Sequence, residues 1–207
     1  MSKTTSNTRG KILDRALEMF NERGIEYVGL RELAADLGMR VSNITYYFPT
    51  KDDLVYQISV ELSRTNGEIM VERKEMTMLM FLETLRKTYL NQIRFKCLML
   101  SFVHVIKQNK RIAAAYNDTQ KARHATIRSN LKLLFDGGYL IMKDEEDVEF
   151  LGSMLALIGR FWISEAAISF RKESESKQVE HYLKLVMKLL IPYASQKGKR
   201  EIDAFIK

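Results

Sequence analysis

Residues that break helices are rare in this chain of 207 residues, which contains two prolines, Pro49 and Pro192, and ten glycines. Proline removes a helical hydrogen bond and glycine lowers helix stability, so long stretches without them favour helices. Apolar side chains recur three and four positions apart in these stretches, which is the period of an amphipathic helix. The sequence therefore predicts an all-α protein. The helices that we expect cover residues 8–23, 30–37, 41–47, 50–72, 76–109 (two helices or one bent one), 112–135, 144–170 and 179–193.

Several residues indicate where these helices begin and end. Gly24 and Gly138 follow helical stretches and can adopt the left-handed conformation that closes a helix. Thr50 and Asp53 have the spacing of a capping box, which predicts that a helix starts at this point. The tail over residues 196–207 is mostly polar, and we expect it to be partly disordered.

The net charge of +7 is of the sign expected for a protein that binds nucleic acid. However, residues 1–55 hold eight basic and eight acidic residues, so this segment is neutral overall. A DNA-binding role must therefore be argued from the pattern of side chains and not from bulk charge.

The cysteine content and the apolar runs of the sequence indicate the cellular compartment of the protein. Cys97 is the single cysteine and lies in an apolar run, so we expect a buried thiol and no intrachain disulfide, as in a reducing cytoplasm. The start of the chain is polar and lacks the apolar core of a signal peptide. Arg160 and Glu165 interrupt the most apolar run before it reaches the ~18 residues of a membrane span. We expect a cytoplasmic protein that does not bind a membrane.

Residues 30–48 have the pattern of a helix-turn-helix. A small side chain stands where the second helix crosses closely, a glycine stands at the turn, and apolar side chains point inward from both helices. The seven positions that fit are Leu33, Ala34, Leu37, Gly38, Met39, Ile44 and Tyr47. The alternative is an ordinary helical hairpin within a core, but seven fitting positions after an amphipathic helix favour the DNA-binding motif.

The stretch from Leu30 to Leu54 resembles the DNA-binding domain of the TetR family of repressors, and Tyr47-Phe-Pro-Thr-Lys-Asp-Asp-Leu54 is its most specific part. The resemblance implies an N-terminal three-helix helix-turn-helix domain over residues 1–55. It also implies a C-terminal helical domain for ligand binding and dimerisation over residues 56–207. A protein of this kind would bind a palindromic operator in double-stranded DNA as a homodimer and be released by a small-molecule inducer.

Matching positions within the resemblance give each residue a role at the DNA. Val41, Ser42 and Asn43 open the recognition helix and would face base edges in the major groove. Hydroxyl and ammonium groups of the remaining residues would contact phosphates, and Arg31 could reach a base or a phosphate. These remaining residues are Thr45, Tyr46, Tyr47 and Lys51.

Two further sets of residues are candidates for a ligand pocket and a dimer interface. Methionine suits adaptable ligand surfaces, and polar groups nearby could anchor an inducer, although the same residues could simply fill a core. The candidate pocket residues are Met70, Met80, Phe81, Arg86, Tyr89 and His104. Paired apolar stripes on the last two strong helices predict a four-helix bundle between subunits, with an intrachain core as the alternative. The candidate interface residues are Leu155, Trp162, Tyr182, Val186 and Leu190.

No motif for catalysis, a cofactor or a metal is present in the sequence. His104, His124 and His181 are isolated from other possible ligands, so we expect no metal site. Nucleophile elbows, phosphate-binding loops and dinucleotide fingerprints are absent, and we expect neither an enzyme nor a cofactor. The sequence therefore predicts a DNA-binding transcriptional regulator. The alternatives are a helical-bundle protein that binds a small molecule or acts as an enzyme without a DNA role, and a helix-turn-helix protein that binds another protein.

Overall fold

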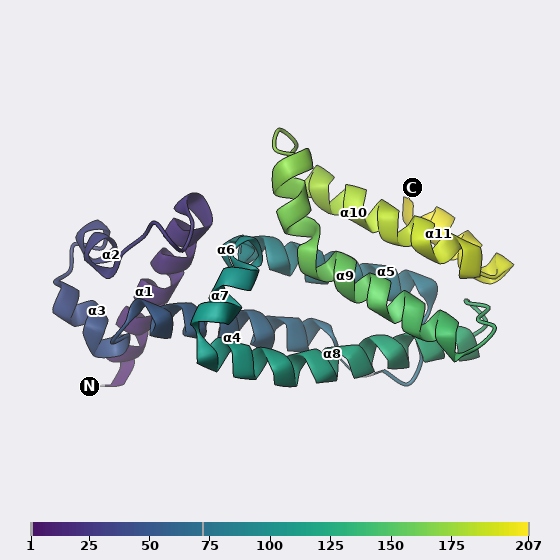
Figure 1. The fold of residues 1–207 in the computed structure, drawn as a ribbon, viewed down its shortest axis with the longest axis horizontal. Helices are drawn as coiled ribbons and strands as arrows, with labels where there is room; N and C mark the ends of the chain where they lie inside the picture. Colours follow the sequence, from purple (N-terminus) through teal and green to yellow (C-terminus); the bar gives the residue numbers. More distant parts are fainter. Residues whose placement is uncertain (1, 72, 207) are drawn as a thin grey trace. The chain divides into compact units, whose positions relative to one another are not determined.

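The computed structural model describes residues 2–71 and 73–206, with side chains described from residue 8 onward. These residues form helices without a strand, which confirms the expected fold class (Figure 1). An isolated bridge pairs Leu140 with Ala194. The helices are α1 (Ser2–Arg23), α2 (Leu30–Asp36), α3 (Val41–Tyr47), α4 (Lys51–Ile69), α5 (Met78–Arg94), α6 (Lys96–Leu100), α7 (Phe102–Gln108), α8 (Lys110–Asp136), α9 (Glu145–Ser169), α10 (Glu175–Leu190) and α11 (Gln196–Ile206), with a short 3₁₀ helix at Ile191–Tyr193.

The helices divide into two compact units. The first unit comprises residues 1–64 and 95–116, and the second comprises residues 65–94 and 117–207. This division differs from the expected single boundary after residue 55, because α6 and α7 belong with the N-terminal helices. The backbone N–H of Cys97 donates to the Asn21 side chain at 3.0 Å, and the Asn109 amide donates to the Asp52 carbonyl at 3.0 Å.

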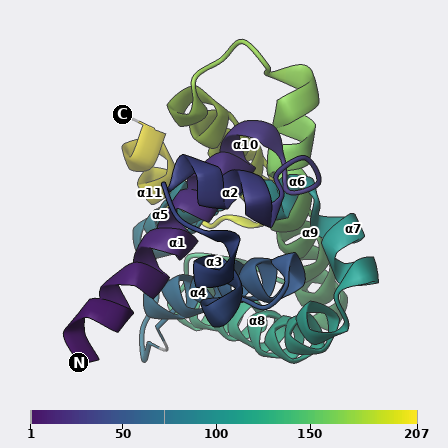
Figure 2. The ribbon, with the colours of Figure 1, turned by 90° about the vertical axis from the view of Figure 1, so that its left-hand side faces the viewer.

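The first unit packs the apolar faces of its helices around α1. Ile12, Ala16 and Phe20 on α1 are buried together with Leu33 of α2 and Ile44 of α3. The turns between these helices depend on glycine. Gly24 has a φ of 93° and Gly38 a φ of 62°, a region that other residues rarely adopt. Figure 2 shows α2 and α3 as two short helices joined by a tight turn.

The second unit has a core built from α5, α8, α9, α10 and α11. Its largest buried side chain is Trp162, which stacks on Tyr89 with ring centroids 5.0 Å apart. Gly138, with a φ of 71°, ends α8 as expected. The Asp144 side chain accepts the backbone N–H of Asp147 at 3.1 Å and thereby caps the start of α9.

Two regions differ from the sequence-based expectation. Residues 76–109 form three helices, α5, α6 and α7, instead of two helices or one bent helix. The tail that we expected to be partly disordered is the helix α11. Ile202 on α11 is buried, and the Glu201 carboxylate accepts the backbone N–H of Leu79 at the start of α5 at 2.8 Å. These few contacts order a segment whose composition is mainly polar.

Candidate nucleic-acid interface and ligand cavity

Helix α3 has one buried side and one exposed side. Ile44 and the following Phe48 are buried, whereas Ser42, Asn43 and Tyr46 are exposed, with Tyr46 at 77%. Val41 is also exposed. The burial of Ile44 fixes the orientation of a seven-residue helix that is too short to be stable alone. The helix therefore presents its polar residues and Val41 outward from the first unit.

Ion pairs attach α2 to α1 and so set the position of the turn that leads into α3. The Arg15 guanidinium contacts both carboxylate oxygens of Asp36, at 2.5 and 2.9 Å. Arg23 pairs with Glu32 at 2.6 Å. The hydrogen bond from Arg15 holds the pKa of the Asp36 carboxyl below its usual value. A two-pronged arginine–carboxylate pair restricts rotation as well as distance.

A reciprocal pair of hydrogen bonds starts α4, as the sequence predicts. The Asp53 side chain accepts the backbone N–H of Thr50, and the Thr50 hydroxyl oxygen accepts the backbone N–H of Asp53, both at 3.1 Å. Arg111 also pairs with Asp53 at 2.6 Å. The hydrogen bonds from Thr50, and then the charge of Arg111, lower the pKa of Asp53. The cap places Lys51 on the first turn of α4.

The residues predicted to contact phosphates differ in their exposure and in the contacts that they already make. The Lys51 ammonium donates to the Glu26 carbonyl at 3.3 Å, and partial burial lowers the pKa of this lysine. An ammonium has three donors, so this bond leaves others for a phosphate. Arg31 is exposed on α2. Tyr47 is half-buried and meets the Tyr46 ring edge-on, with centroids 5.0 Å apart.

The second unit contains a cavity of about 80 Å³. Its walls come from the end of α4 and from α5, α8 and α9, and they combine apolar side chains with amide, hydroxyl and guanidinium groups. The lining residues are Asn66, Met70, Phe81, Thr84, Leu85, Thr88, Tyr89, Gln92, Arg123, Ile127, Asn130, Leu155, Ala156, Gly159 and Arg160. The mixed lining is of the kind found in small-molecule sites, although the cavity itself is smaller than such sites usually are.

Hydrogen bonds make the cavity wall rigid where α5 meets α9. The Gln92 side chain donates to the Gly159 carbonyl at 2.9 Å and accepts the indole N–H of Trp162 at 2.6 Å. On the other side of α5, the Asn91 amide donates to Asn66 at 2.9 Å. Burial raises the pKa of the Tyr89 hydroxyl, which is therefore protonated near neutral pH.

Both parts of the chain match models of one family. Residues 12–58 match the model described as bacterial regulatory proteins of the TetR family, and residues 66–202 match the model described as a bacterial transcriptional repressor. The chain belongs to the TetR family. The resemblance seen in residues 30–54 is confirmed, and the TetR-family match extends over the C-terminal region, residues 66–202.

Solved structures of TetR-family proteins share this fold. A TetR-family regulator from Marinobacter aquaeolei VT8 is 19% identical, with 96% of each chain covered and a TM-score of 0.88. A putative transcriptional regulator from Saccharomonospora viridis in complex with choline is 20% identical, over 87% of this chain and 96% of that one, with a TM-score of 0.66. The SmeT–triclosan complex is 14% identical, over 92% and 93% of the two chains, with a TM-score of 0.63. No curated protein matches the sequence.

In the structure of this TetR-family regulator, the six residues predicted to line a pocket lie at different sites. Met70, Phe81 and Tyr89 line the cavity. Met80 packs against the hydrophobic core, and His104 lies in the first unit with its imidazole 4.0 Å from the Glu26 carboxylate.

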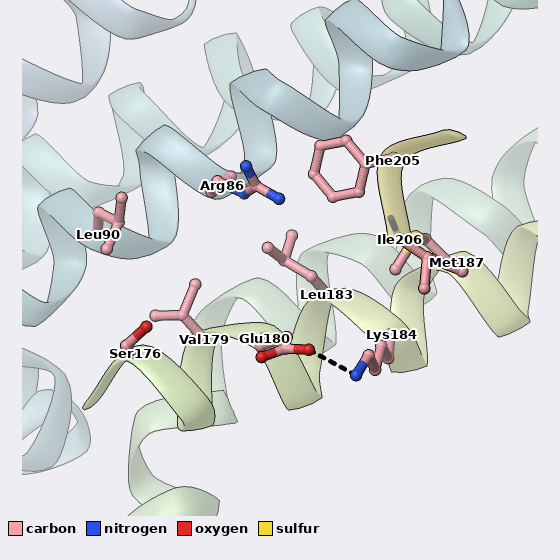
Figure 3. A pocket seen from close by; sticks show the side chains of 10 residues that line it. All are labelled: Arg86, Leu90, Ser176, Val179, Glu180, Leu183, Lys184, Met187, Phe205 and Ile206. Atoms are coloured by element: carbon pink, nitrogen blue, oxygen red, sulfur yellow. Dashed lines mark hydrogen bonds and ion pairs between the residues drawn. The ribbon is translucent and has the colours of Figure 1, made fainter. Parts of the chain in front are cut away.

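Arg86 lies in a different groove between α5, α10 and α11, where its guanidinium is 4.2 Å from the Phe205 ring centroid (Figure 3). Arg86 lies on a different side of α5 from the cavity residues. Phe81, Leu85 and Tyr89 are four positions apart and so share one side of the helix, whereas Arg86 is offset from them by one position.

The five predicted interface residues are buried within one chain of the regulator. Leu155 and Trp162 on α9 are 5% and 2% exposed, and Tyr182, Val186 and Leu190 on α10 are at most 4% exposed. Their side chains therefore form intrachain core, the alternative that the sequence left open. The physical reason is that α9 and α10 pack against each other and against α5 and use their strongest apolar stripes there.

Most polar residues of the cavity were not among the sequence-based candidates. Thr84, Thr88 and Gln92 line it at four-residue spacing along α5, a polar row that the sequence contains. Asn130 has the polar neighbours Ser129 and Lys132, so the sequence does not set it apart as a cavity residue. Arg123 carries no such signal, because arginine is common on exposed helix faces. Arg160 does carry one, because it is a charged residue within the most apolar run of the chain.

Proposed function

We propose that this TetR-family regulator binds operator DNA as a homodimer and that a small ligand in its cavity releases it. The observation that carries the proposal is the outward face of α3, where Ser42, Asn43 and Tyr46 are exposed while Ile44 anchors the helix. Hydroxyl and amide groups at the start of such a helix can reach base edges in the major groove. A cytoplasmic location follows from this role.

The charges around α3 suit a polyanion. Arg40 and Lys51 flank the segment from residue 40 to residue 51, which contains no acidic residue. Tyr46 and Tyr47 add hydroxyl groups that can donate to phosphates. The net charge of residues 1–55 is zero, but that of residues 40–51 is positive. The local charge therefore supports DNA binding, although the net charge of the whole segment does not.

A second copy of the chain is proposed to cover the outer face of α9. Phe150, Leu157 and Ile168 lie along α9 and are 46%, 50% and 78% exposed. Leu185 on α10 is 41% exposed. The most apolar window of α9 is 33% buried in the single chain, and its length and composition alone would also suit a membrane span, a test that core helices pass too. Contact between two copies would remove this apolar surface from water.

The proposed release depends on two helices that contribute residues to both units. Both α4 and α8 line the cavity and also include residues of the first unit. A ligand that fits the cavity better in one arrangement of these helices shifts the population toward that arrangement. The neighbours in complex with choline and triclosan support a cavity that holds small molecules.

A gel-shift assay with the DNA upstream of the regulator's own gene tests the proposal. We expect retardation of this duplex at concentrations that leave a shuffled duplex of equal length and composition free. A helical-bundle protein that only binds a small molecule, or an enzyme, would retard neither duplex. Equal retardation of both would indicate charge-driven binding without sequence recognition and would also contradict the proposal.

A further inference from the structure

The first turn of α4 carries Lys51, which the proposed function places at a phosphate of the operator. A lysine side chain is long and flexible, so the position of its ammonium depends on how firmly the backbone beneath it is held. The reciprocal hydrogen bonds between Thr50 and Asp53 fix the conformation of this turn. They do not fix its position within the first unit, so other contacts must hold it there.

Asn109, which directly precedes α8, holds the backbone of this turn. Its side-chain amide donates to the Asp52 carbonyl at 3.0 Å. Its side-chain oxygen accepts the backbone N–H groups of Arg111 and Ile112, both at 3.1 Å, and thereby caps α8. Asn109 is 8% exposed, and a buried amide bonded at both ends cannot rotate without losing a hydrogen bond. Asn109 therefore fixes the start of α8 against the start of α4.

Arg111 contacts the same part of α4. Its guanidinium lies 2.6 Å from the Asp53 carboxylate and 3.9 Å from the Tyr56 ring centroid. A planar guanidinium can pair with a carboxylate and stack on a ring at the same time, which a lysine ammonium cannot do equally well. Positions 52, 53 and 56 lie on one side of α4. The start of α8 thus holds one side of the turn that carries the proposed phosphate contact.

From these contacts we propose that Asn109 and Arg111 are positioning residues for DNA binding, which hold the first turn of α4 so that Lys51 meets a phosphate. The proposal rests on the proposed function and adds residues of another element to it. Both residues act through α4 and not by touching the DNA. They lie outside residues 12–58, the part of the chain that matches the family's N-terminal model.

Fluorescence anisotropy of the full chain with its upstream duplex, measured over a range of salt concentrations, tests the proposal. K51A is the reference, because one lost phosphate contact lowers the slope of log K against log salt by ~0.9. R111Q and N109S should each lower this slope by roughly 0.5 to 0.9 and weaken binding roughly threefold to tenfold.

The two variants are chosen to leave the fold intact. The Arg111 side chain is 59% exposed, and an exposed ion pair adds little to stability. In N109S the serine can still cap α8, but its side chain is too short to reach the Asp52 carbonyl. R111K keeps a positive charge beside Asp53 and should restore most of the binding that R111Q loses. Circular dichroism and thermal unfolding check each variant.

Double variants separate positioning from a merely structural role. In K51A the phosphate contact is already lost, so adding R111Q or N109S should weaken binding by less than about twofold. A change that disturbed the whole domain would weaken K51A as much as it weakens the unaltered chain. The same would hold if Arg111 itself contacted a phosphate.

R128Q is the matched control. Arg128 is an arginine of the same helix that pairs with Glu145 and Glu149 of α9, so R128Q removes ion pairs of α8 without affecting the contacts to α4. It should leave both the affinity for the duplex and the salt slope unchanged.

Three results would overturn the proposal: R111Q and N109S binding with unaltered affinity and slope, either change weakening K51A as much as it weakens the unaltered chain, or K51A itself keeping the full slope. A regulator that shifts its upstream DNA but gives any of these results would retain the proposed function and lose the positioning role of α8.

Discussion

At the scale of single residues, neighbouring side chains of the regulator can differ completely in their exposure to solvent. Asn43 is exposed on α3, while Ile44 beside it is completely buried. The sequence predicts this alternation, since Ile44 follows the helix-turn-helix spacing. The contacts of Lys51 with the Glu26 carbonyl and of Arg15 with Asp36 could not be predicted, because they join residues 25 and 21 positions apart.

Replacing Asn43 with alanine should change which operator sequence the regulator prefers. The side chain is exposed and makes no contact that the fold needs, so the thermal stability should stay the same. Loss of a base contact costs about 1–3 kcal/mol at the base that it reads. Binding to a set of single-base operator variants measures the effect, with Asn117→Ala on exposed α8 as the control. An unchanged preference profile would show that Asn43 does not read a base.

Cys97 should be inert while the regulator is folded. The side chain is 1% exposed, and burial raises the pKa of its thiol to about 12 from 9.0. The reactive thiolate is therefore scarce at neutral pH. Because the folded state holds this proton more tightly, the free energy of unfolding should fall as the pH rises from 9 toward 12. Reaction with a dithiobisnitrobenzoate reagent should be slow in the native protein and fast in guanidinium chloride; equal rates would contradict the burial.

At the scale of helices, the sequence predicted the caps and turns correctly but did not predict contacts between distant parts of the chain. The Thr50–Asp53 cap, Gly24 and Gly38 act within one turn of chain, and the structure places each as expected. The tail became α11 because Ile202 is buried and Glu201 meets the start of α5, 122 positions earlier in the chain. Composition alone cannot reveal such contacts. The cavity required four helices to converge, and its Arg123 was missed for the same reason.

Two glycines in helices of the second unit should respond oppositely to alanine. A Cβ on Gly198 of α11 would lie 2.2 Å from the Tyr139 carbonyl oxygen, and the resulting backbone shift should cost about 1–3 kcal/mol. A Cβ on Gly67 of α4 meets no atom within 4 Å, so G67A should stabilise the protein by up to about 1 kcal/mol. Urea unfolding of both variants measures the two effects. Equal stabilities would show that α11 does not pack closely at Gly198.

At the scale of the whole molecule, the apolar stripes of α9 and α10 that we expected at a dimer interface pack inside a single chain. Val186 and Leu190 are fully buried, so a glutamate at either position should unfold the second unit and not merely separate subunits. The surface that we propose for a partner is the outer side of α9, where Leu157 and Ile168 are exposed. The interface residues predicted on α9 and α10 are buried within one chain, because periodicity does not show which stripe the chain itself will cover. The dimer interface stays a prediction.

Leu157→Glu should therefore separate the proposed dimer without unfolding it. Leu157 is 50% exposed in the single chain, and an ionised carboxylate in an apolar contact between copies would cost several kcal/mol. Sedimentation equilibrium should show a monomer with an unchanged circular dichroism spectrum. Val103→Glu, at a 53% exposed position of α7, is the matched control and should remain dimeric. A dimeric L157E variant would remove this face of α9 from the interface.

The central claim is that two copies of α3 read one operator together, and hydroxyl-radical footprinting of the upstream DNA tests it most directly. Two recognition helices of a dimer reach successive major grooves on one side of the duplex, about 34–36 Å apart. We predict two protected segments of related, inverted sequence at this spacing, both lost in L157E and retained in V103E. A single protected segment, or protection that L157E leaves intact, would contradict the account.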